Sequence, residues 1–386
     1  MPNLGDRFTV GVVGGGLIGG AAARHLAEAG HRVVVVAAPE PSGWSNHAGP
    51  FASHYDSGRI TRITSADPVW AEIAARSTAR YADIEQRSGI SFHDPRGLAW
   101  FGMDLEPTVN NALERGGDAR LVSEEWLFET TGVRRPALEG LACAWEGPPA
   151  GVVNPRQMAA AQLALAEAAG AVVIRQPATG LSSIPDGVEI VGTFGSVIAD
   201  RVLVAAGAYS ADLIGQSLHH DRQLRTTVRI DMGPAPEVPS IISEQVEHPY
   251  INDMYSNPPV RYPDSRLLFK IGCEILDPPR AQSIAEITSW FQGNGDPEEA
   301  DALLATTRAL LPNAEIRSWE AVPCVITRST SKYPNIGWVD DRIAVAAAGN
   351  GSSAKSSDEL GRLASTLFSE HGWSDDVLDA ETFAPT

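Results

Sequence analysis

The sequence predicts a mixed α/β fold with two domains, and three observations lead to that prediction. The chain has 386 residues, and at about 150 residues per domain this length accommodates two or three lobes. Hydrophobic residues make up 43% and charged residues 20%, which is the balance of a globular protein rather than a disordered one. Residues 8–37 have the pattern of a strand, a glycine-rich turn, a helix and a second strand, which is a βαβ unit.

The charge and the cysteine content exclude several classes of protein. Lysine and arginine total 30 against 48 acidic residues, and the net charge of −18 disfavours nucleic acid and anionic lipid as partners. No run of about 20 apolar residues is present, so we expect no membrane span. The three cysteines, Cys143, Cys273 and Cys324, lie far apart, which predicts no disulfide framework and no metal site. A reducing, cytoplasmic location is the simpler expectation.

The first βαβ unit begins with the strand Phe8–Val13 and continues through a helix that ends near Gly30 to the strand Arg32–Ala37. Between strand and helix stands a GxGxxG pattern made by Gly14, Gly16 and Gly19. The first glycine permits a tight turn, the second lets a pyrophosphate approach the backbone, and the third lets helix and strand pack closely. The context therefore favours a Rossmann-like dinucleotide-binding unit over a tight turn without a ligand.

The unit lacks one usual feature. An acidic residue normally ends the second strand and binds the ribose, but here the strand ends in the apolar Ala37. Glu40 follows in the next loop and is the candidate for that contact. No arginine replaces the acid, so a 2′-phosphate is not favoured either.

Further elements follow from periodicity and turn residues. An amphipathic helix is predicted over 68–87, and a long helix over 156–169. A hairpin through 188–199 and the strand 201–205 lead into Ala205–Tyr209, an order that suits flavoproteins better than nicotinamide dehydrogenases. Other predicted elements are strands at 98–101, 172–175 and 342–348, a helix at 296–310 in a proline-rich lobe over 216–320, and a helix at 356–368.

Lysine is rare in this chain. Only three of the 30 basic residues are lysines, at positions 270, 332 and 355. Lysine is a compact point charge and arginine a planar fork, so arginine does not replace lysine at every site. This difference directs attention to Lys270 and Lys355, with retention by chance as the alternative.

Four blocks of the sequence carry a family resemblance. The blocks are Gly14–Gly30, Ser53–Arg62, Lys270–Gly272, and Cys324 together with Gly349–Lys355. In their order and spacing they make the chain similar to the D-amino-acid-oxidase-like flavoproteins and, within them, to the monomeric sarcosine oxidase family. The resemblance implies a discontinuous FAD-binding domain over 1–90, 150–215 and 321–386, and a substrate domain with a mixed or antiparallel sheet over 91–149 and 216–320.

The resemblance also implies roles for individual residues. Arg62 and Lys355 are expected to bind the carboxylate of an amino-acid substrate, since arginine offers a planar fork for such a group. Lys270 is expected to face the flavin and to assist the reduction of O2 by electrostatic stabilisation. Cys324 is expected to carry FAD through a thioether. The further residues expected to contact the cofactor are Gly14, Gly16, Gly19, Glu40, Ser53, Arg59, Ala206, Gly207, Gly349, Gly351 and Lys355.

The chain departs from the family pattern near the expected pocket. Tyr55 and Glu274 stand where family members often have histidines, and Ser352–Ala354 replaces a His-Gly-Phe run. Tyr55, Tyr255 and Glu274 are expected to line the substrate pocket, where Glu274 either pairs with a second amine of the substrate or faces solvent. These departures leave sarcosine itself in question as the substrate.

The expected reaction is FAD-dependent oxidation of a C–N bond in an amino acid that carries a secondary, N-methyl or cyclic amine, with O2 as acceptor and H2O2 as product. One alternative is a biosynthetic flavin dehydrogenase or oxidase that acts on a larger amine. A different alternative is a nucleotide-binding subunit without turnover of its own. The expected partners are a small amine substrate and O2, and the expected assembly is a monomer or a homodimer.

Overall fold

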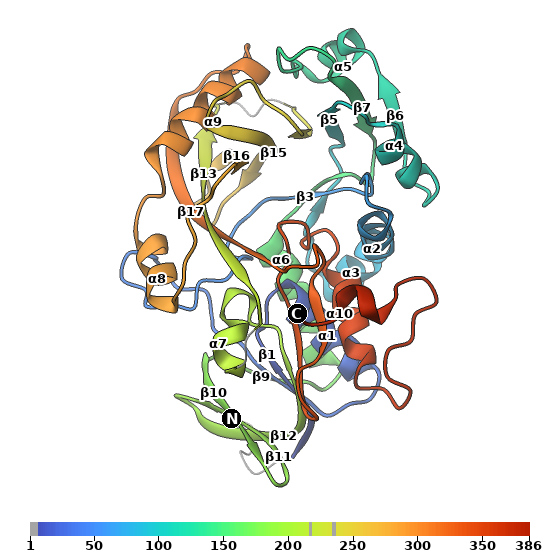
Figure 1. Cartoon of the computed structure of the whole chain (residues 1–386), viewed down its shortest axis with the longest axis vertical. Coiled ribbons are helices and arrows are strands. Elements are labelled where there is room, and N and C mark those ends of the chain that lie inside the picture. Colours follow the sequence, from blue (N-terminus) through green and yellow to red (C-terminus); the bar gives the residue numbers. More distant parts are fainter. Residues whose placement is uncertain (1–6, 216–217, 234–236) are drawn as a thin grey trace.

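Two large sheets organise the chain. The computed structural model describes residues 7–215, 218–233 and 237–386. It contains two eight-stranded sheets and one three-stranded sheet. Figure 1 shows one large sheet, with β1 and β9–β12, in the lower half and the other, with β13 and β15–β17, in the upper half. The mixed α/β class predicted from the sequence is confirmed.

The first sheet has a parallel centre. Its strands follow the order β10-β11-β12-β1-β2-β9, with β19 beside β12 and β18 beside β19. Strand β1 pairs in parallel with both β12 and β2, so their carboxyl ends lie at one edge. The bounds are β1 Phe8–Val13, β2 Val33–Val36, β9 Val172–Ile174, β10 Ala178–Ile184, β11 Gly187–Gly192, β12 Gly195–Val204, β18 Asn335–Trp338 and β19 Ile343–Ala347.

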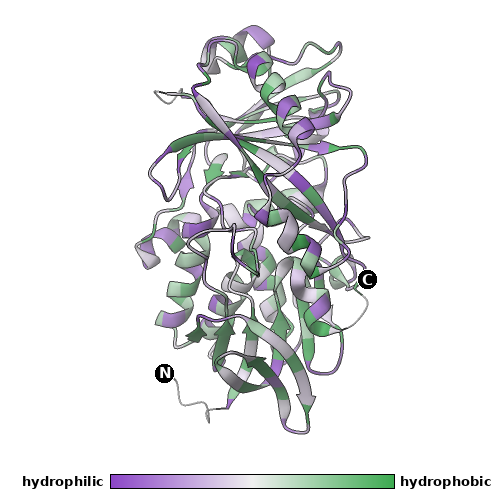
Figure 2. Ribbon diagram, turned by 90° about the vertical axis from the view of Figure 1, so that its left-hand side faces the viewer, coloured by the Kyte–Doolittle hydropathy of each residue, from purple (hydrophilic) through white to green (hydrophobic). Residues whose placement is uncertain are grey.

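Three helices pack against one another beside this sheet. Helix α1 (Leu17–Glu28) packs against α6 (Pro155–Ala168) and α10 (Ser357–Thr366). The close approach of α1 and α10 requires a glycine, because a Cβ at Gly361 would lie 2.5 Å from the Cβ of Ala21. Hydrophobic residues, green in Figure 2, follow the strands in the lower half of the molecule, where those of β1 and β2 are buried. The predicted βαβ unit is therefore confirmed.

The second sheet is mostly antiparallel. Its order is β17-β13-β16-β15-β14-β5-β7-β6. The bounds are β5 Leu98–Gly102, β6 Ala119–Val122, β7 Ala142–Glu146, β13 Asp221–Asp231, β14 Ser240–Ser243, β15 Ile251–Arg261, β16 Leu267–Ile275 and β17 Ser318–Arg328. Helix α9 (Pro297–Leu310), capped by Asp296, covers one face through Leu303 and Leu304. The expected domain boundary at residue 321 falls inside β17.

Short elements connect the two sheets. The three-stranded sheet consists of β3 (Arg59–Thr61), β8 (Gly151–Val153) and β4 (His93–Asp94). The remaining helices are α4 Glu106–Leu113, α5 Glu124–Thr131, α7 Ser210–Ile214 and α8 Ile284–Gln292. No helix in the described part of the chain is long and apolar enough to cross a membrane.

The single helix predicted over 68–87 is wrong. The segment forms two helices, α2 (Pro68–Thr78) and α3 (Tyr81–Ser88), with a break at Ala79 and Arg80. Beyond the break the Tyr81 hydroxyl donates to the carbonyl oxygen of Lys355 at 2.8 Å, and Arg80 forms ion pairs with Asp358 and Glu359. These partners are distant in sequence, so the local periodicity does not reveal them.

Candidate functional site

The glycine-rich turn has the geometry that its sequence predicts. Gly14 has a φ of +108°, and a Cβ there would lie 2.3 Å from the carbonyl oxygen of Ala205. A Cβ at Gly19 would lie 1.9 Å from the Gly14 oxygen. Gly16 differs, because its backbone is extended and the nearest described atom to an added Cβ is Nδ1 of His54, at 3.3 Å. Gly14 and Gly19 therefore serve the turn itself, whereas Gly16 keeps the space in front of it open.

The space in front of Gly16 suits an anion. Gly16 is the N-cap residue of α1, and no side chain among the described residues caps the peptide N–H groups of the first turn. These groups and the helix dipole attract phosphate. Beside it, burial, followed by the Arg156 and Arg59 charges, lowers the pKa of His54 to about 4, so the ring is neutral at neutral pH and can still donate a hydrogen bond. A dinucleotide pyrophosphate fits this position.

Two other loops reach the same edge of the first sheet. Because β12 and β19 run parallel to β1, the segments that follow them leave the sheet beside the glycine turn. The loop after β12 contains Ala206 and Gly207, and the loop after β19 contains Gly349 and Gly351. The second loop is sharply turned, with φ values of +61° at Ala348 and +74° at Gly351. Ligands of open α/β sheets bind at this kind of edge.

The end of β2 is closely packed, and the nearest acid of the following loop is already paired. A Cβ at Gly15 would lie 2.7 Å from the Cβ of Ala37, so this corner is closely packed. Glu40 lies beyond it and pairs with Arg156, with distances of 2.7 to 2.9 Å between its carboxylate oxygens and the Arg156 nitrogens. The Glu40 carboxylate therefore already has a strong partner. Tyr55 lies beside this corner, where its hydroxyl donates to the Ala38 oxygen at 3.2 Å and burial raises its pKa to about 12.

The second sheet presents a polar face to the other half of the site. In β16, Lys270, Gly272 and Glu274 alternate with Phe269, Ile271 and Cys273. The second set belongs to the hydrophobic cluster under α9, so the first set points to the opposite face. The strand register adds cross-strand neighbours: Arg229 and Asn257 pair with Lys270, and Tyr255 pairs with Gly272.

Asp56 is the central anion at this face, and the sequence analysis did not single it out. Its Oδ2 accepts a hydrogen bond from Lys270 Nζ at 2.7 Å and pairs with Arg59. Its Oδ1 accepts from the Tyr262 hydroxyl at 2.9 Å and lies 3.6 Å from Arg229 Nη2. Three cations thus surround one carboxylate. The available signal was that Asp56 is the only acidic residue in the block 51–62.

Lys270 is buried and ion-paired. Its side chain is 1% exposed, and Nζ also donates to the carbonyl oxygen of Gly58. Burial and the Arg59 guanidinium lower the pKa of Lys270, while the nearby Asp56 carboxylate opposes that shift. The structure therefore places this lysine in a compensated cluster rather than alone. Asn257 beside it is also buried, and neither of its amide atoms has a hydrogen-bond partner in the described parts of the chain.

Arg62 and Lys355 approach each other at the other end of the site. Burial, followed by the Arg62 charge, lowers the pKa of Lys355 well below its usual value. Burial also lowers the pKa of Arg62 to about 10, although Glu146 and Glu244 oppose this shift. Lys355 is buried and Arg62 half-buried, and two such cations that repel each other favour an anion between them.

Aromatic rings and carbonyl groups hold these two cations. The Arg62 guanidinium lies 4.3 Å from the centre of the Trp100 ring, and Lys355 Nζ lies 5.1 Å from the Trp70 ring. Lys355 Nζ donates to the Ser352 carbonyl oxygen at 3.0 Å. Neither side chain forms a hydrogen bond to a carboxylate of the described residues, so their remaining donors can receive a ligand.

Cys324 and Tyr255 lie on the polar face near Lys270. Cys324 is half-buried on β17, is not in a disulfide with any described residue, and accepts a hydrogen bond at its carbonyl oxygen from Trp290. Burial raises the pKa of Tyr255, as does the neighbouring Cys324. A Cβ at Gly272 would lie 2.5 Å from the Tyr255 hydroxyl, so the glycine makes room for this ring.

The Glu274 carboxylate is already paired with side chains of the protein. Its two carboxylate oxygens pair with Arg225, at 3.1 Å, and with Arg328. Ser53 and Arg59 meet through the Ser53 carbonyl oxygen, which accepts from Arg59 Nη2 at 2.9 Å. The structure thus gathers the predicted residues into three groups: one around the glycine turn, one on the polar face, and the pair Arg62 and Lys355 beside Trp100 and Trp70.

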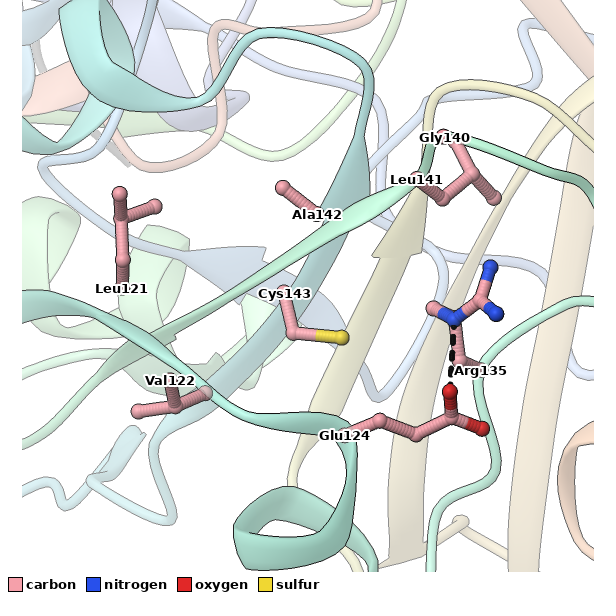
Figure 3. A pocket seen from close by; sticks show the side chains of 8 residues that line it. All are labelled: Leu121, Val122, Glu124, Arg135, Gly140, Leu141, Ala142 and Cys143. Atoms are coloured by element: carbon pink, nitrogen blue, oxygen red, sulfur yellow. Dashed lines mark hydrogen bonds and ion pairs between the residues drawn. The ribbon is translucent and has the colours of Figure 1, made fainter.

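A separate hollow of about 440 Å³ lies between β6, β7 and the segment after α5 (Figure 3). Glu124 and Arg135 form an ion pair across it at 2.9 Å, and burial raises the pKa of Cys143 in its wall to about 11. None of its lining residues belongs to the predicted site. The described residues also contain no group of three or more side chains that could hold a metal ion.

Comparison with known proteins gives both a family and a fold. The family model described as FAD dependent oxidoreductase matches residues 9–367. Monomeric sarcosine oxidase from Bacillus sp. (strain B-0618) is 27% identical over 219 residues, which is 55% of this chain and 54% of that protein. The aligned stretch therefore spans about half of that relative.

Several solved structures share the fold along nearly the whole chain. NikD, described as an unusual amino acid oxidase essential for nikkomycin biosynthesis, matches with a TM-score of 0.76 at 21% identity, covering 98% of each chain. Glycine oxidase from Geobacillus kaustophilus matches with a TM-score of 0.72 at 22% identity, covering 98% of each chain. L-proline dehydrogenase from P. horikoshii matches with a TM-score of 0.75 at 16% identity, covering 98% of this chain and 97% of that one.

Proposed function

The chain belongs to the family of FAD-dependent oxidoreductases, and from this premise we propose that it oxidises a C–N bond of an amino acid with a secondary, N-methyl or cyclic amine. The observation that carries the proposal is the pair of neighbouring cations, Arg62 and Lys355, whose charges act on each other and neither of which forms a hydrogen bond to a carboxylate of the described residues. Two cations around one anion select an amino acid over a simple amine.

The cofactor has a site in this proposal. Gly16 and the first turn of α1 receive the pyrophosphate, and the loops at Ala206–Gly207 and Gly349–Gly351 border the remainder. The segment that contains β1, β2 and β12 then forms the FAD domain, and the second sheet covers it as the substrate domain. FAD, when bound, would accept the electrons that the amine loses.

The protein's own residues bind and orient the substrate. Arg62 and Lys355 hold the carboxylate between the Trp70 and Trp100 rings, which exclude water from the ion pairs. A fixed carboxylate restricts the orientation of the adjacent C–N bond, and such positioning is a large part of catalysis. The test is an anaerobic mixing experiment with a panel of N-methyl, cyclic and primary amino acids. Loss of the visible flavin absorbance with secondary amino acids supports the proposal, and no loss with any member contradicts it.

Cys324 is the proposed attachment point of FAD. The half-buried thiol lies on the same face as Lys270, and it has no disulfide partner among the described residues. Acid denaturation and washing test this attachment. We expect the yellow colour to stay with the wild-type polypeptide and to wash out of the Cys324→Ala variant. If colour washes out of both proteins, FAD is bound without a covalent link.

O2 is the proposed electron acceptor, with Lys270 near the reacting groups. A second candidate is a flavin dehydrogenase for a larger amine, and the ion pair between Lys270 and Asp56 favours it because a compensated charge stabilises developing superoxide less. Reoxidation of the reduced protein by O2 and by an artificial acceptor separates the two. Fast reoxidation by O2 that slows at least tenfold in Lys270→Met supports the oxidase, whereas slow reoxidation in both proteins supports the dehydrogenase.

A further inference from the structure

A charged group extends across the polar face beyond Lys270. We call Arg225, Arg328, Glu274 and Asp253 the Arg225 cluster. Glu274 bridges the two arginines, with 3.1 Å between its Oε2 and Nη2 of Arg225. Asp253 faces Glu274 across β15 and β16 and accepts a hydrogen bond from its peptide N–H at 2.7 Å. Four neighbouring strands, β17, β13, β16 and β15, therefore bring these side chains together.

Arg225 has donors that the protein does not use. Its side chain is 3% exposed, yet Nε and Nη1 have no hydrogen-bond partner in the described parts of the chain. A buried donor without a partner is unfavourable, and more so when the group is charged. A guanidinium whose edge is free and buried is suited to a planar, bidentate anion such as a carboxylate.

The charge balance of the cluster also favours an anion. Two guanidinium groups face Glu274, so its charge is already compensated and it has little left for an ammonium group. Burial, followed by the Glu274 charge, raises the pKa of Asp253 to about 7, so this second carboxyl is partly neutral at neutral pH. The remaining charge of the cluster is positive.

The cluster adjoins the substrate site already described. Arg225 pairs in register with Cys324, so both point to the polar face that carries Lys270. Arg328 Nη1 lies 3.5 Å from the carbonyl oxygen of Asn350, in the loop that continues to Lys355. One loop thus borders both the Lys355 cation and the Arg225 cluster.

We propose that the Arg225 cluster is a second anion-binding subsite of the substrate pocket, and that the substrate is an amino acid with a second carboxylate. This inference rests on the proposed function, since it takes Arg62 and Lys355 as the site of the first carboxylate. Arg225 contributes the two free donors, Gln223 accepts from its Nη2 at 2.9 Å and holds the guanidinium in place, and the Glu274 carboxylate competes with the ligand for the arginine charge. The second carboxylate then sets specificity, because a substrate without it leaves the Arg225 donors unpaired.

Ligand binding without turnover tests the subsite. The probes are glutarate and valerate, which have the same chain length and differ in one carboxylate, added to the full FAD-loaded protein in a calorimeter. We expect glutarate to bind at least tenfold more tightly than valerate. Arg225→Gln is expected to remove that advantage and to leave valerate binding unchanged. Equal affinities in the wild type, or an advantage that survives in Arg225→Gln, overturn the inference.

A second variant guards against a folding defect in Arg225→Gln. Glu274→Gln removes the internal partner of both arginines, so we expect glutarate to bind at least threefold more tightly than in the wild type. Weaker glutarate binding in this variant would contradict the proposal. Arg175→Gln is the matched control, because Arg175 is 60% exposed and pairs only with Glu167 on the surface among the described residues.

The outcomes separate this inference from the proposed function. If valerate binds and bleaching by amino acids occurs, but glutarate has no advantage, the second subsite is refuted and the oxidation of an amino acid stands. If neither acid binds, the carboxylate site at Arg62 and Lys355 is refuted, and the inference falls with it.

Discussion

Replacing Asp56 by asparagine should destabilise the protein more than replacing Lys270 by methionine, although the two residues form one ion pair. Asp56 is the shared partner of Lys270, Arg59 and Arg229. Asp56→Asn leaves the buried Lys270 and two partly buried arginines together, and the remaining carboxylate near Arg229 is that of Glu320 at 3.7 Å. Lys270→Met leaves Asp56 with two arginines and removes an ammonium that is 1% exposed.

The expected loss of unfolding free energy follows from the number of charged partners that each variant leaves unpaired. Removing one member of a buried ion pair costs about 3 to 5 kcal/mol when the other charge is left uncompensated. Asp56→Asn falls in that range, since no other carboxylate among the described residues lies within ion-pair distance of Lys270. Lys270→Met removes hydrogen bonds from a carboxylate that keeps other partners, so its cost is about 1 kcal/mol. The expected difference is therefore about 2 to 4 kcal/mol.

The assay is urea denaturation of both variants in excess FAD, followed by tryptophan fluorescence and by circular dichroism. The double variant Asp56→Asn/Lys270→Met should be more stable than Asp56→Asn alone, because it holds one cation fewer. An equal or larger loss in Lys270→Met than in Asp56→Asn would refute the view that Asp56 organises this cluster.

Three further predictions follow from the same structure. Gly16→Ala should weaken FAD binding at least tenfold, or about 1.4 kcal/mol. The measurement is a titration of FAD-free protein with FAD in a Cys324→Ala background. Gly14→Ala should instead fail to fold, because its Cβ would meet backbone atoms. Because the folded-state pKa of Asp253 is raised from 3.8 to about 7, its contribution to stability is full below pH 3.8 and is lost as the pH rises through 7. Asp253→Asn should therefore match the wild type at pH 4 and exceed its free energy of unfolding by about 4 kcal/mol at pH 8 in urea denaturation. Equal stability at both pH values would contradict this. Lys355→Met should raise KM for the amino-acid substrate at least tenfold, and an unchanged KM would show that Lys355 does not bind the substrate. The Tm of this variant should be higher than that of the wild type, because the variant lacks a buried ammonium group that has no hydrogen-bonded carboxylate partner among the described residues.

Local sequence signals predicted the elements that depend on local chemistry. The strand Phe8–Val13 and the turn at Gly14 follow from apolar periodicity and from a backbone conformation that glycine adopts readily. The helix over 68–87 was predicted as continuous for the same reason, because its amphipathic pattern has no proline or glycine inside it. Its break places Tyr81 against the Lys355 carbonyl oxygen, and only the folded chain shows that contact.

The candidate site divides in the same way. Arg62, Lys270 and Lys355 could be selected from the sequence because residue type and spacing identify them. The sequence does not assign Asp56 its role, since its partners Lys270, Tyr262 and Arg229 lie more than 170 residues away along the chain. Glu274 was placed near the pocket, but its two arginine partners come from β13 and β17 and were not predicted.

The sequence of one strand predicts part of the polar face of the second sheet, and the neighbouring strands determine the rest. In β16 the alternation of Lys270, Gly272 and Glu274 with apolar residues is visible in the sequence and predicts one polar and one buried face. The charge state of that polar face depends on the strands beside it, because β13 contributes Arg225 and Arg229, while β15 contributes Asp253. Taken alone, Glu274 suggests a site for an amine. Paired with Arg225 and Arg328, it belongs to a surface that favours a carboxylate, so the register of the sheet reverses the sign of the ligand that the strand suggests.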